Sequence, residues 1–300
     1  MKKIFYILCG SLLINSVMAD PLDASSPVDA TNASAPINKN VAKIESYVEQ
    51  KDYDKAIKLG EKINTESKDS KVSLYLGKSY FLKHNYQKSV KYFKDAANKG
   101  EARAMLTLGN MYGSGTGVPK NIYKAINWYK KAVDLNNVDA MNYLGLIYRD
   151  GVSGQPDYPE AIKLFTQAAS NENAEGYFNL GYMYQNGLGS PVDYAKAIDN
   201  YSKAAKLGNV YAMNNLGVIY SEGKGITQDY KQSLNWYILA ATKGDATAQC
   251  NVGMFYFYGL GVTKNYESAK TWFKLADKNG CLKAHEYLAK IGTESKANSF

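Results

Sequence analysis

The chain has 300 residues, of which 45% are hydrophobic and 21% are charged, and its net charge is +8. The hydrophobic content is typical of a folded protein, whereas the length exceeds what a single compact core usually holds. A repeat array escapes that limit because it grows by adding units. With only two histidines, the chain offers little for metal chemistry.

Residues 1–19 have the pattern of a secretory signal peptide. Lys2 and Lys3 precede an apolar stretch, which ends in a small-residue cleavage site at Ala19. No later apolar run approaches the length of a membrane span. We therefore predict an exported chain, periplasmic or secreted, that has no membrane span once the signal peptide is removed.

Residues 20–100 change in character near residue 40. Residues 20–40 are rich in Ala, Ser, Asp and Pro and cannot bury enough apolar surface to offset chain entropy, so we predict a disordered linker. Residues 41–100 contain two helical segments, "KDYDKAIKLGEKI" and "HNYQKSVKYFKDAANKG", that lack the glycine-rich turns found later in the chain.

Residues 101–280 repeat themselves every 36 residues. Each unit has a glycine within its first helix (helix A) and a glycine-rich turn before its second helix (helix B). The first glycine of that turn is Gly115, Gly151, Gly187, Gly223 or Gly259. Such self-similarity indicates a stacked repeat array. A phosphate-binding loop would be a single element that follows a strand, whereas this turn occurs five times after a helical pattern, so we interpret it as a structural bend.

The helix-A glycine needs a packing reason, because Gly217 costs about 1 kcal/mol of helix propensity relative to alanine. A small residue recurs on helix B, as Ser233 in the same unit and as Ala197 and Ala269 in neighbouring units. We predict that the glycine faces this small residue and lets the two helices cross closely. After the last unit, residues 281–292 are predicted to form a capping helix, followed by a frayed tail that ends at residue 300.

The unit resembles a known family. The stretch "AMLTLGNMYGSGTGVPKNIYKAINWYKKAV" in residues 101–136 is similar to the Sel1-like repeat, a branch of the tetratricopeptide-repeat superfamily, and five full units cover 101–280. Residues 41–100 look like ordinary tetratricopeptide units. The resemblance implies an all-α fold, a right-handed α-solenoid of helix-turn-helix repeats. It also implies a protein-interaction scaffold, and exported bacterial members often act in envelope assembly, signalling regulation or contact with host cells.

The superfamily pattern places a concave binding groove on helix A, at positions six and three residues before the helix-A glycine and one, four and five after it. Aromatic, arginine and amide side chains mix at these positions, as in surfaces that bind extended peptides. The groove residues carried onto this chain are Arg103, Asn110, Asn142, Arg149, Phe178, Tyr182, Gln185, Tyr211, Asn214, Met254, Phe257 and Tyr258. The alternative for Phe178 and Tyr211 is packing between units.

The partner is therefore expected to be a protein or peptide segment, with no cofactor and no metal. The lysines fall mainly among polar positions of helix B, which indicates a solvated outer face, and basic runs with base-stacking geometry are missing, so we predict no nucleic-acid binding.

We predict that the chain is not an enzyme. His84 and His285 lie far apart in the sequence, and neither is near a carboxylate or cysteine group with ligand spacing. Some cysteine-rich relatives have been credited with penicillin binding or β-lactamase activity. Ser221 and Lys224 form a Ser-x-x-Lys tetrad, but its companion motifs are absent. A hydrolase of that type and a structural spacer without a groove ligand stay as alternatives.

Cys250 and Cys281 remain after signal removal. An exported protein favours oxidised cysteines. Cys250 lies within one helix A, Cys281 is expected to begin the next, and neighbouring helices about 10 Å apart with an axial offset argue against a bond that needs Cα atoms within about 7 Å. A disulfide between these residues is therefore the less favoured alternative.

Overall fold

The computed structural model describes residues 39–64 and 69–297. Within these ranges the chain forms fifteen α-helices and no β-strand. The predicted signal peptide at 1–19 lies outside the described residues, as does the predicted linker up to residue 38. The linker's last two residues, Lys39 and Asn40, already belong to the first helix.

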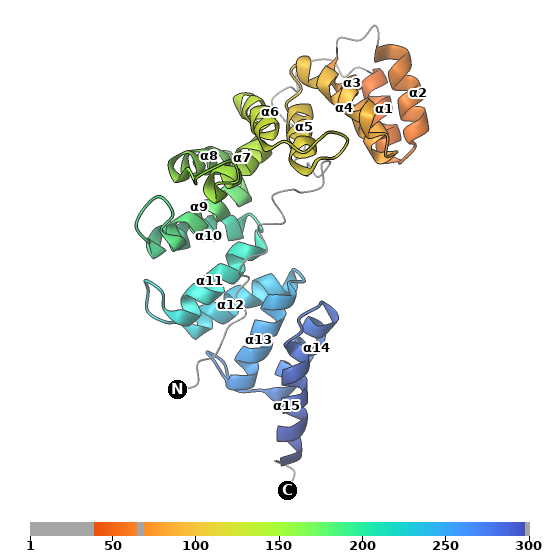
Figure 1. Cartoon of the computed structure of the whole chain (residues 1–300). Coiled ribbons are helices and arrows are strands. Elements are labelled where there is room, and N and C mark those ends of the chain that lie inside the picture. Colours follow the sequence, from red (N-terminus) through yellow and green to blue (C-terminus); the bar gives the residue numbers. More distant parts are fainter. Residues whose placement is uncertain (1–38, 65–68, 298–300) are drawn as a thin grey trace. The chain divides into compact units, whose positions relative to one another are not determined.

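The helices fall into two compact parts, divided between residues 168 and 169. Figure 1 labels the helices in chain order. The N-terminal part holds α1 (Lys39–Glu49), α2 (Tyr53–Asn64), α3 (Ser70–Leu82), α4 (Tyr86–Asn98), α5 (Ala102–Ser114), α6 (Ile122–Asp134), α7 (Val138–Asp150) and most of α8 (Tyr158–Ser170). The C-terminal part holds α9 (Ala174–Asn186), α10 (Tyr194–Lys206), α11 (Val210–Glu222), α12 (Tyr230–Thr242), α13 (Ala246–Tyr258), α14 (Tyr266–Lys278) and α15 (Ala284–Ala297).

Consecutive helices pack in pairs within each part. In the N-terminal part α3 packs on α4 and α5 on α6, and in the C-terminal part α9 packs on α10, α11 on α12 and α13 on α14. Within each part, neighbouring pairs also contact each other, as α4 contacts α5 and α12 contacts α13. The predicted fold class is confirmed: the architecture is an all-α solenoid of helix pairs.

The sequence sets the ends of the helices through local capping. Asn and Asp side chains at the N-caps accept a hydrogen bond from a backbone N–H in the first turn, as Asp229 does from Gln232 and Asn209 from Ala212. In residues 101–280, each helix A ends at a turn glycine in the left-handed conformation, where φ lies between 64° and 84°: Gly115, Gly151, Gly187, Gly223 and Gly259.

An aromatic ring covers the glycine within helix A. A Cβ on Gly217 would lie 2.6 Å from a ring carbon of Tyr237 in α12. The same contact recurs as Gly77 with Phe93, Gly109 with Tyr129, Gly145 with Phe165, Gly181 with Tyr201 and Gly253 with Phe273. The small residue Ser233 instead donates a hydrogen bond to the Gly217 carbonyl, at 2.6 Å. The ring, rather than the predicted small residue, therefore occupies the space above the glycine.

A second glycine in the turn fits against the preceding helix pair. Gly261 has a φ of 63°, and a Cβ there would lie 2.6 Å from the backbone nitrogen of Lys231 and 2.6 Å from the carbonyl carbon of Tyr230. The corresponding contacts elsewhere join Gly117 to Tyr86 and Gly225 to Tyr194. The turn of one unit thus rests on the start of helix B in the unit before it.

The last helix differs from its prediction. α15 begins at Ala284 and continues to Ala297, past residue 292 and into the segment predicted to be frayed. Its buried residues Ala284 and Ile291 join the apolar cluster of α13 and α14, so the helix caps the final pair as expected. Among the helices that the structure describes, none is both long enough and apolar enough to cross a membrane.

Candidate partner-binding surface

The twelve predicted groove residues are divided between the two compact parts. Arg103 and Asn110 lie on or beside α5, and Asn142 and Arg149 on α7, all in the N-terminal part. The other eight lie in the C-terminal part, on α9, α11 and α13: Phe178, Tyr182, Gln185, Tyr211, Asn214, Met254, Phe257 and Tyr258.

Burial separates these twelve residues into two groups. Seven are buried: Asn110, Asn142, Arg149, Phe178, Asn214, Met254 and Phe257. Arg103, Tyr182 and Gln185 are half-buried, while Tyr211 is 52% exposed and Tyr258 is 40% exposed. Only the second group presents substantial side-chain surface to a partner, and the binding role of all twelve residues stays a prediction.

In the N-terminal part the buried groove residues take part in internal polar contacts. Arg149 holds Asp150 with two hydrogen bonds, Nε to Oδ1 at 2.6 Å and a second nitrogen to Oδ2 at 2.9 Å. Asn110 Oδ1 accepts a hydrogen bond of 2.7 Å from the hydroxyl of Tyr129. Burial raises the pKa of Tyr129, so this hydroxyl stays protonated and remains a donor. These two residues therefore have structural partners of their own.

In the C-terminal part an aromatic pair adjoins a buried amide. The ring of Tyr211 lies 6.1 Å from that of Phe178, which lies 5.8 Å from Tyr201. Asn214 follows Tyr211 by three residues and so lies on the same face of α11. Its Nδ2 donates to Asp245 Oδ1 at 3.1 Å, whereas its buried Oδ1 has no donor among the described residues. We call Phe178, Tyr211 and Asn214 the aromatic–amide patch.

A second aromatic cluster lies at the end of the C-terminal part. Phe257 contacts Tyr258 at 4.9 Å and Tyr266 at 5.2 Å between ring centroids, and Tyr287 of α15 lies 5.5 Å from Phe257. The groove pattern predicts Phe257 and Tyr258 but not Tyr266 or Tyr287. Tyr266 recurs at the 36-residue spacing with Tyr158, Tyr194 and Tyr230, which is a signal in the sequence, whereas Tyr287 has no counterpart in the two preceding units.

The residues suggested for hydrolysis do not form a reactive arrangement. Ser221 is 1% exposed, and its hydroxyl donates to the carbonyl of Val218 at 2.9 Å. Lys224 forms an ion pair of 2.6 Å with Glu222. A nucleophile must reach both a base and a substrate, and this serine is bonded to the backbone beneath the surface.

The histidines have ordinary local partners. His84 lies in the α3–α4 turn, where its Nδ1 is 2.9 Å from the hydroxyl of Tyr86, and His285 Nε2 is 3.0 Å from Asp277 Oδ1. Across residues 39–64 and 69–297, no group of three or more His, Cys, Asp or Glu side chains could hold a metal ion.

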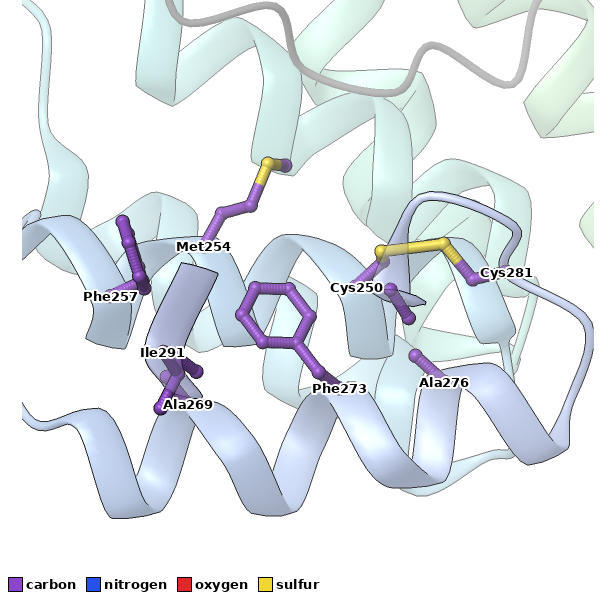
Figure 2. Packing of buried hydrophobic residues seen from close by; sticks show 9 residues of the cluster. Cys250, Met254, Phe257, Ala269, Phe273, Ala276, Cys281 and Ile291 are labelled. Atoms are coloured by element: carbon purple, nitrogen blue, oxygen red, sulfur yellow. A yellow bond between two sulfur atoms is a disulfide. The ribbon is translucent and has the colours of Figure 1, made fainter. Parts of the chain in front are cut away.

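Cys250 and Cys281 are joined by a disulfide (Figure 2). Their Cα atoms are 6.6 Å apart, within the range that a disulfide spans. The expectation that an axial offset would keep them apart is therefore wrong. Cys281 does not begin a helix: it lies in the turn before α15, and its backbone N–H donates to the carbonyl of Ala276 at 2.8 Å. A turn approaches α13 more closely than a packed helix would.

Comparison with known proteins places these features in a family. The model of the Sel1 repeat matches residues 71–101, 102–137, 138–173, 174–209, 210–245 and 246–281. Six units are thus recognised, one more than the five predicted, because the match includes α3 and α4, which the sequence pattern assigned to ordinary tetratricopeptide units. No match was found among the curated proteins compared with the chain.

Solved structures of repeat proteins resemble the chain. A protective antigen of uropathogenic Escherichia coli with an SLR fold is 31% identical, with a TM-score of 0.73 over 87% of this chain and 53% of that protein. The chain thus spans about half of the antigen's length. A Sel1 repeat protein from Oxalobacter formigenes is 35% identical, with a TM-score of 0.65 over 72% of this chain and 88% of that one.

A more distant likeness shows the fold alone. The C-terminal part of a TPR repeat-containing protein from Cytophaga hutchinsonii is 16% identical, with a TM-score of 0.53 over 83% of this chain and 99% of that chain. The family model matches most of the sequence, and the solved Sel1 repeat protein shares its helix pairs. The chain therefore belongs to the Sel1 repeat family.

Proposed function

We propose that this protein is an exported interaction scaffold that holds a segment of a partner protein against its helix-A surfaces. Sel1 repeat proteins are generally protein-interaction scaffolds, and that general role applies to this chain through its family. The specific groove ligand, the export and a role in the envelope or in contact with a host are the parts that we propose.

The observation that carries the binding proposal is the aromatic–amide patch. Tyr211 is 52% exposed although it lies on helix A, where the other aromatic side chain of the patch, Phe178, is 7% exposed. Aromatic residues that combine apolar surface with a hydroxyl are enriched where proteins bind one another. Asn214, which is buried three residues further along α11, donates from Nδ2 to Asp245 Oδ1 at the start of α13, so it braces the face from which Tyr211 projects.

Replacing Tyr211 with alanine should weaken partner binding by at least about 30-fold, the effect expected for a central aromatic contact. The partner would first be captured from envelope extract and then titrated in purified form by calorimetry. Tyr123 of α6, a helix B, is 69% exposed and provides the control, because Tyr123→Ala removes an even more exposed tyrosine ring elsewhere. Equal affinities of the two variants would remove the patch from the interface and favour the spacer alternative.

Export is supported by two independent features. Residues 1–19 carry the signal-peptide pattern, and the Cys250–Cys281 disulfide is of the kind that persists in oxidising compartments. The likeness to a protective antigen of a uropathogenic bacterium supports exposure to a host. The expected mature chain begins at Asp20, which intact-mass spectrometry of protein from the periplasm or the culture medium would show. A full-length chain that stays in the cytoplasm with free thiols would refute export.

A further inference from the structure

The attachment of α15 relies on few buried side chains. Of its residues 284–293, only Ala284 and Ile291 are buried, while Tyr287 and Leu288 are partly buried against the cluster formed with α13 and α14. The remaining side chains in this range are exposed. Buried apolar area is the main source of packing stability, so the helix depends on a small contact.

The same helix covers part of the predicted groove. Tyr287 stacks on Phe273 with ring centroids 4.8 Å apart and meets the edges of Phe257 at 5.5 Å and Tyr258 at 6.2 Å. Phe257 is 5% exposed with α15 in place. Departure of α15 would therefore uncover Phe257 and give Tyr258 more contact surface.

The disulfide lies at the base of this helix. It joins Cys250, within α13, to Cys281, in the turn that leads directly into α15, and Figure 2 shows both residues beside the apolar cluster. The bond closes a loop across a sequence separation of 31 residues. Cys281 is 9% exposed as a residue and Cys250 is 0% exposed, so Cys281 is the more accessible end of the bond.

We propose that the Cys250–Cys281 disulfide controls the attachment of α15: while the bond is intact, α15 keeps Phe257 buried and covers part of Tyr258, and reduction loosens the helix. A dithiol reductant attacks the Cys281 sulfur, the S–S bond breaks, and the Cys250 thiolate leaves and takes up a proton. The second reductant thiol then releases Cys281 as a thiol, so the reductant becomes a disulfide and two electrons and two protons pass to the protein. α15 is then held without a covalent link, by noncovalent contacts that include its small apolar contact and the contact of His285 with Asp277, and it opens more often.

α15 lies outside the loop that the disulfide closes, so reduction acts on it by releasing the turn that leads into it, and the open population of α15 should rise. The units before it need not open, because in a repeat array each unit contacts mainly its neighbours. The movement of α15 does not depend on the proposed function, whereas its effect on binding at Phe257 and Tyr258 does.

Hydrogen exchange measured by mass spectrometry tests whether the disulfide controls the attachment of α15. The full chain would carry Cys9→Ser, so that Cys250 and Cys281 are its only cysteines, and would be compared with and without dithiothreitol. Amides of residues 284–293 are expected to lose protection on reduction, while those of α11 keep theirs. Unchanged protection of α15, or an equal loss in α11, would overturn the proposal.

Two variants separate the disulfide from general damage. Cys250→Ala/Cys281→Ala in the same background should show the open level of exchange with or without the reductant, and any remaining response would overturn the assignment. Ile291→Ala keeps the bond and weakens only the apolar contact, so its α15 should become more sensitive to reduction than that of the parent chain. If α15 opens as expected but the purified partner binds both redox states equally, redox control of α15 is supported and the proposed binding at Phe257 and Tyr258 fails.

Discussion

Gly261→Ala is expected to destabilise the C-terminal part by about 3 kcal/mol, through backbone strain of about 1 kcal/mol or more and overpacking of 1–3 kcal/mol. At a φ of 63° an alanine is strained, and its Cβ would lie 2.6 Å from backbone atoms of Tyr230 and Lys231. Backbone in a capped helix start cannot rotate aside as a side chain can. The turn must therefore lift away from the preceding helix pair.

Gly244 provides the matched control for this change. It also has a positive φ, of 92°, but a Cβ there would meet nothing within 4 Å. Gly244→Ala should therefore cost only the conformational strain, about 1 kcal/mol. Urea unfolding followed by circular dichroism would compare the two variants with the parent chain. Similar losses for both would show that contact between units contributes little at this junction.

Phe273→Ala should cost about 3–5 kcal/mol, the range for removing a buried aromatic ring. Phe273 is fully buried, covers Gly253 and stacks on Tyr287 at 4.8 Å. Glycine at position 253 contributes no side chain to refill the space, so a cavity would remain between α13 and α14. Thermal and chemical unfolding would both report the loss.

Leu275 tests whether the effect belongs to the buried ring. It lies two residues further along α14 and is 40% exposed, so Leu275→Ala should change the free energy of unfolding by about 0.5 kcal/mol or less. If Phe273→Ala were as mild as Leu275→Ala, the glycine–aromatic contact would not hold the helix pair together.

The helix pairs and their ends could be predicted because their causes are local. A 36-residue recurrence shows which faces must pack, Asn and Asp cap helix starts, and glycine allows the left-handed ends. Ser233 does face Gly217 through its hydrogen bond to the carbonyl, but a close crossing alone does not predict that the ring of Tyr237 fills the space beside the glycine. The large aromatic side chain at Tyr237 recurs at the same 36-residue spacing, so the signal was present.

The accessibility of the groove could not be read from spacing. Position along helix A identifies which side chains share a face of the helix. Whether those side chains are exposed depends on how closely the neighbouring helices approach that face. Asn110 and Arg149 occupy groove positions and yet bond to Tyr129 and Asp150 inside the N-terminal part. The Cys250–Cys281 distance likewise does not follow from helix spacing, because it depends on a turn rather than on the separation of two helix axes.

The contact between a turn glycine and the tyrosine that starts the preceding helix B recurs with little change, as Gly225 on Tyr194 and Gly261 on Tyr230. Excision of residues 210–245 would bring Gly261 opposite Tyr194, so the new seam would reproduce the old one. Gene rearrangements in whole 36-residue blocks can therefore shorten or extend the protein without inventing an interface. The reach of the molecule can evolve separately from the chemistry of any one unit.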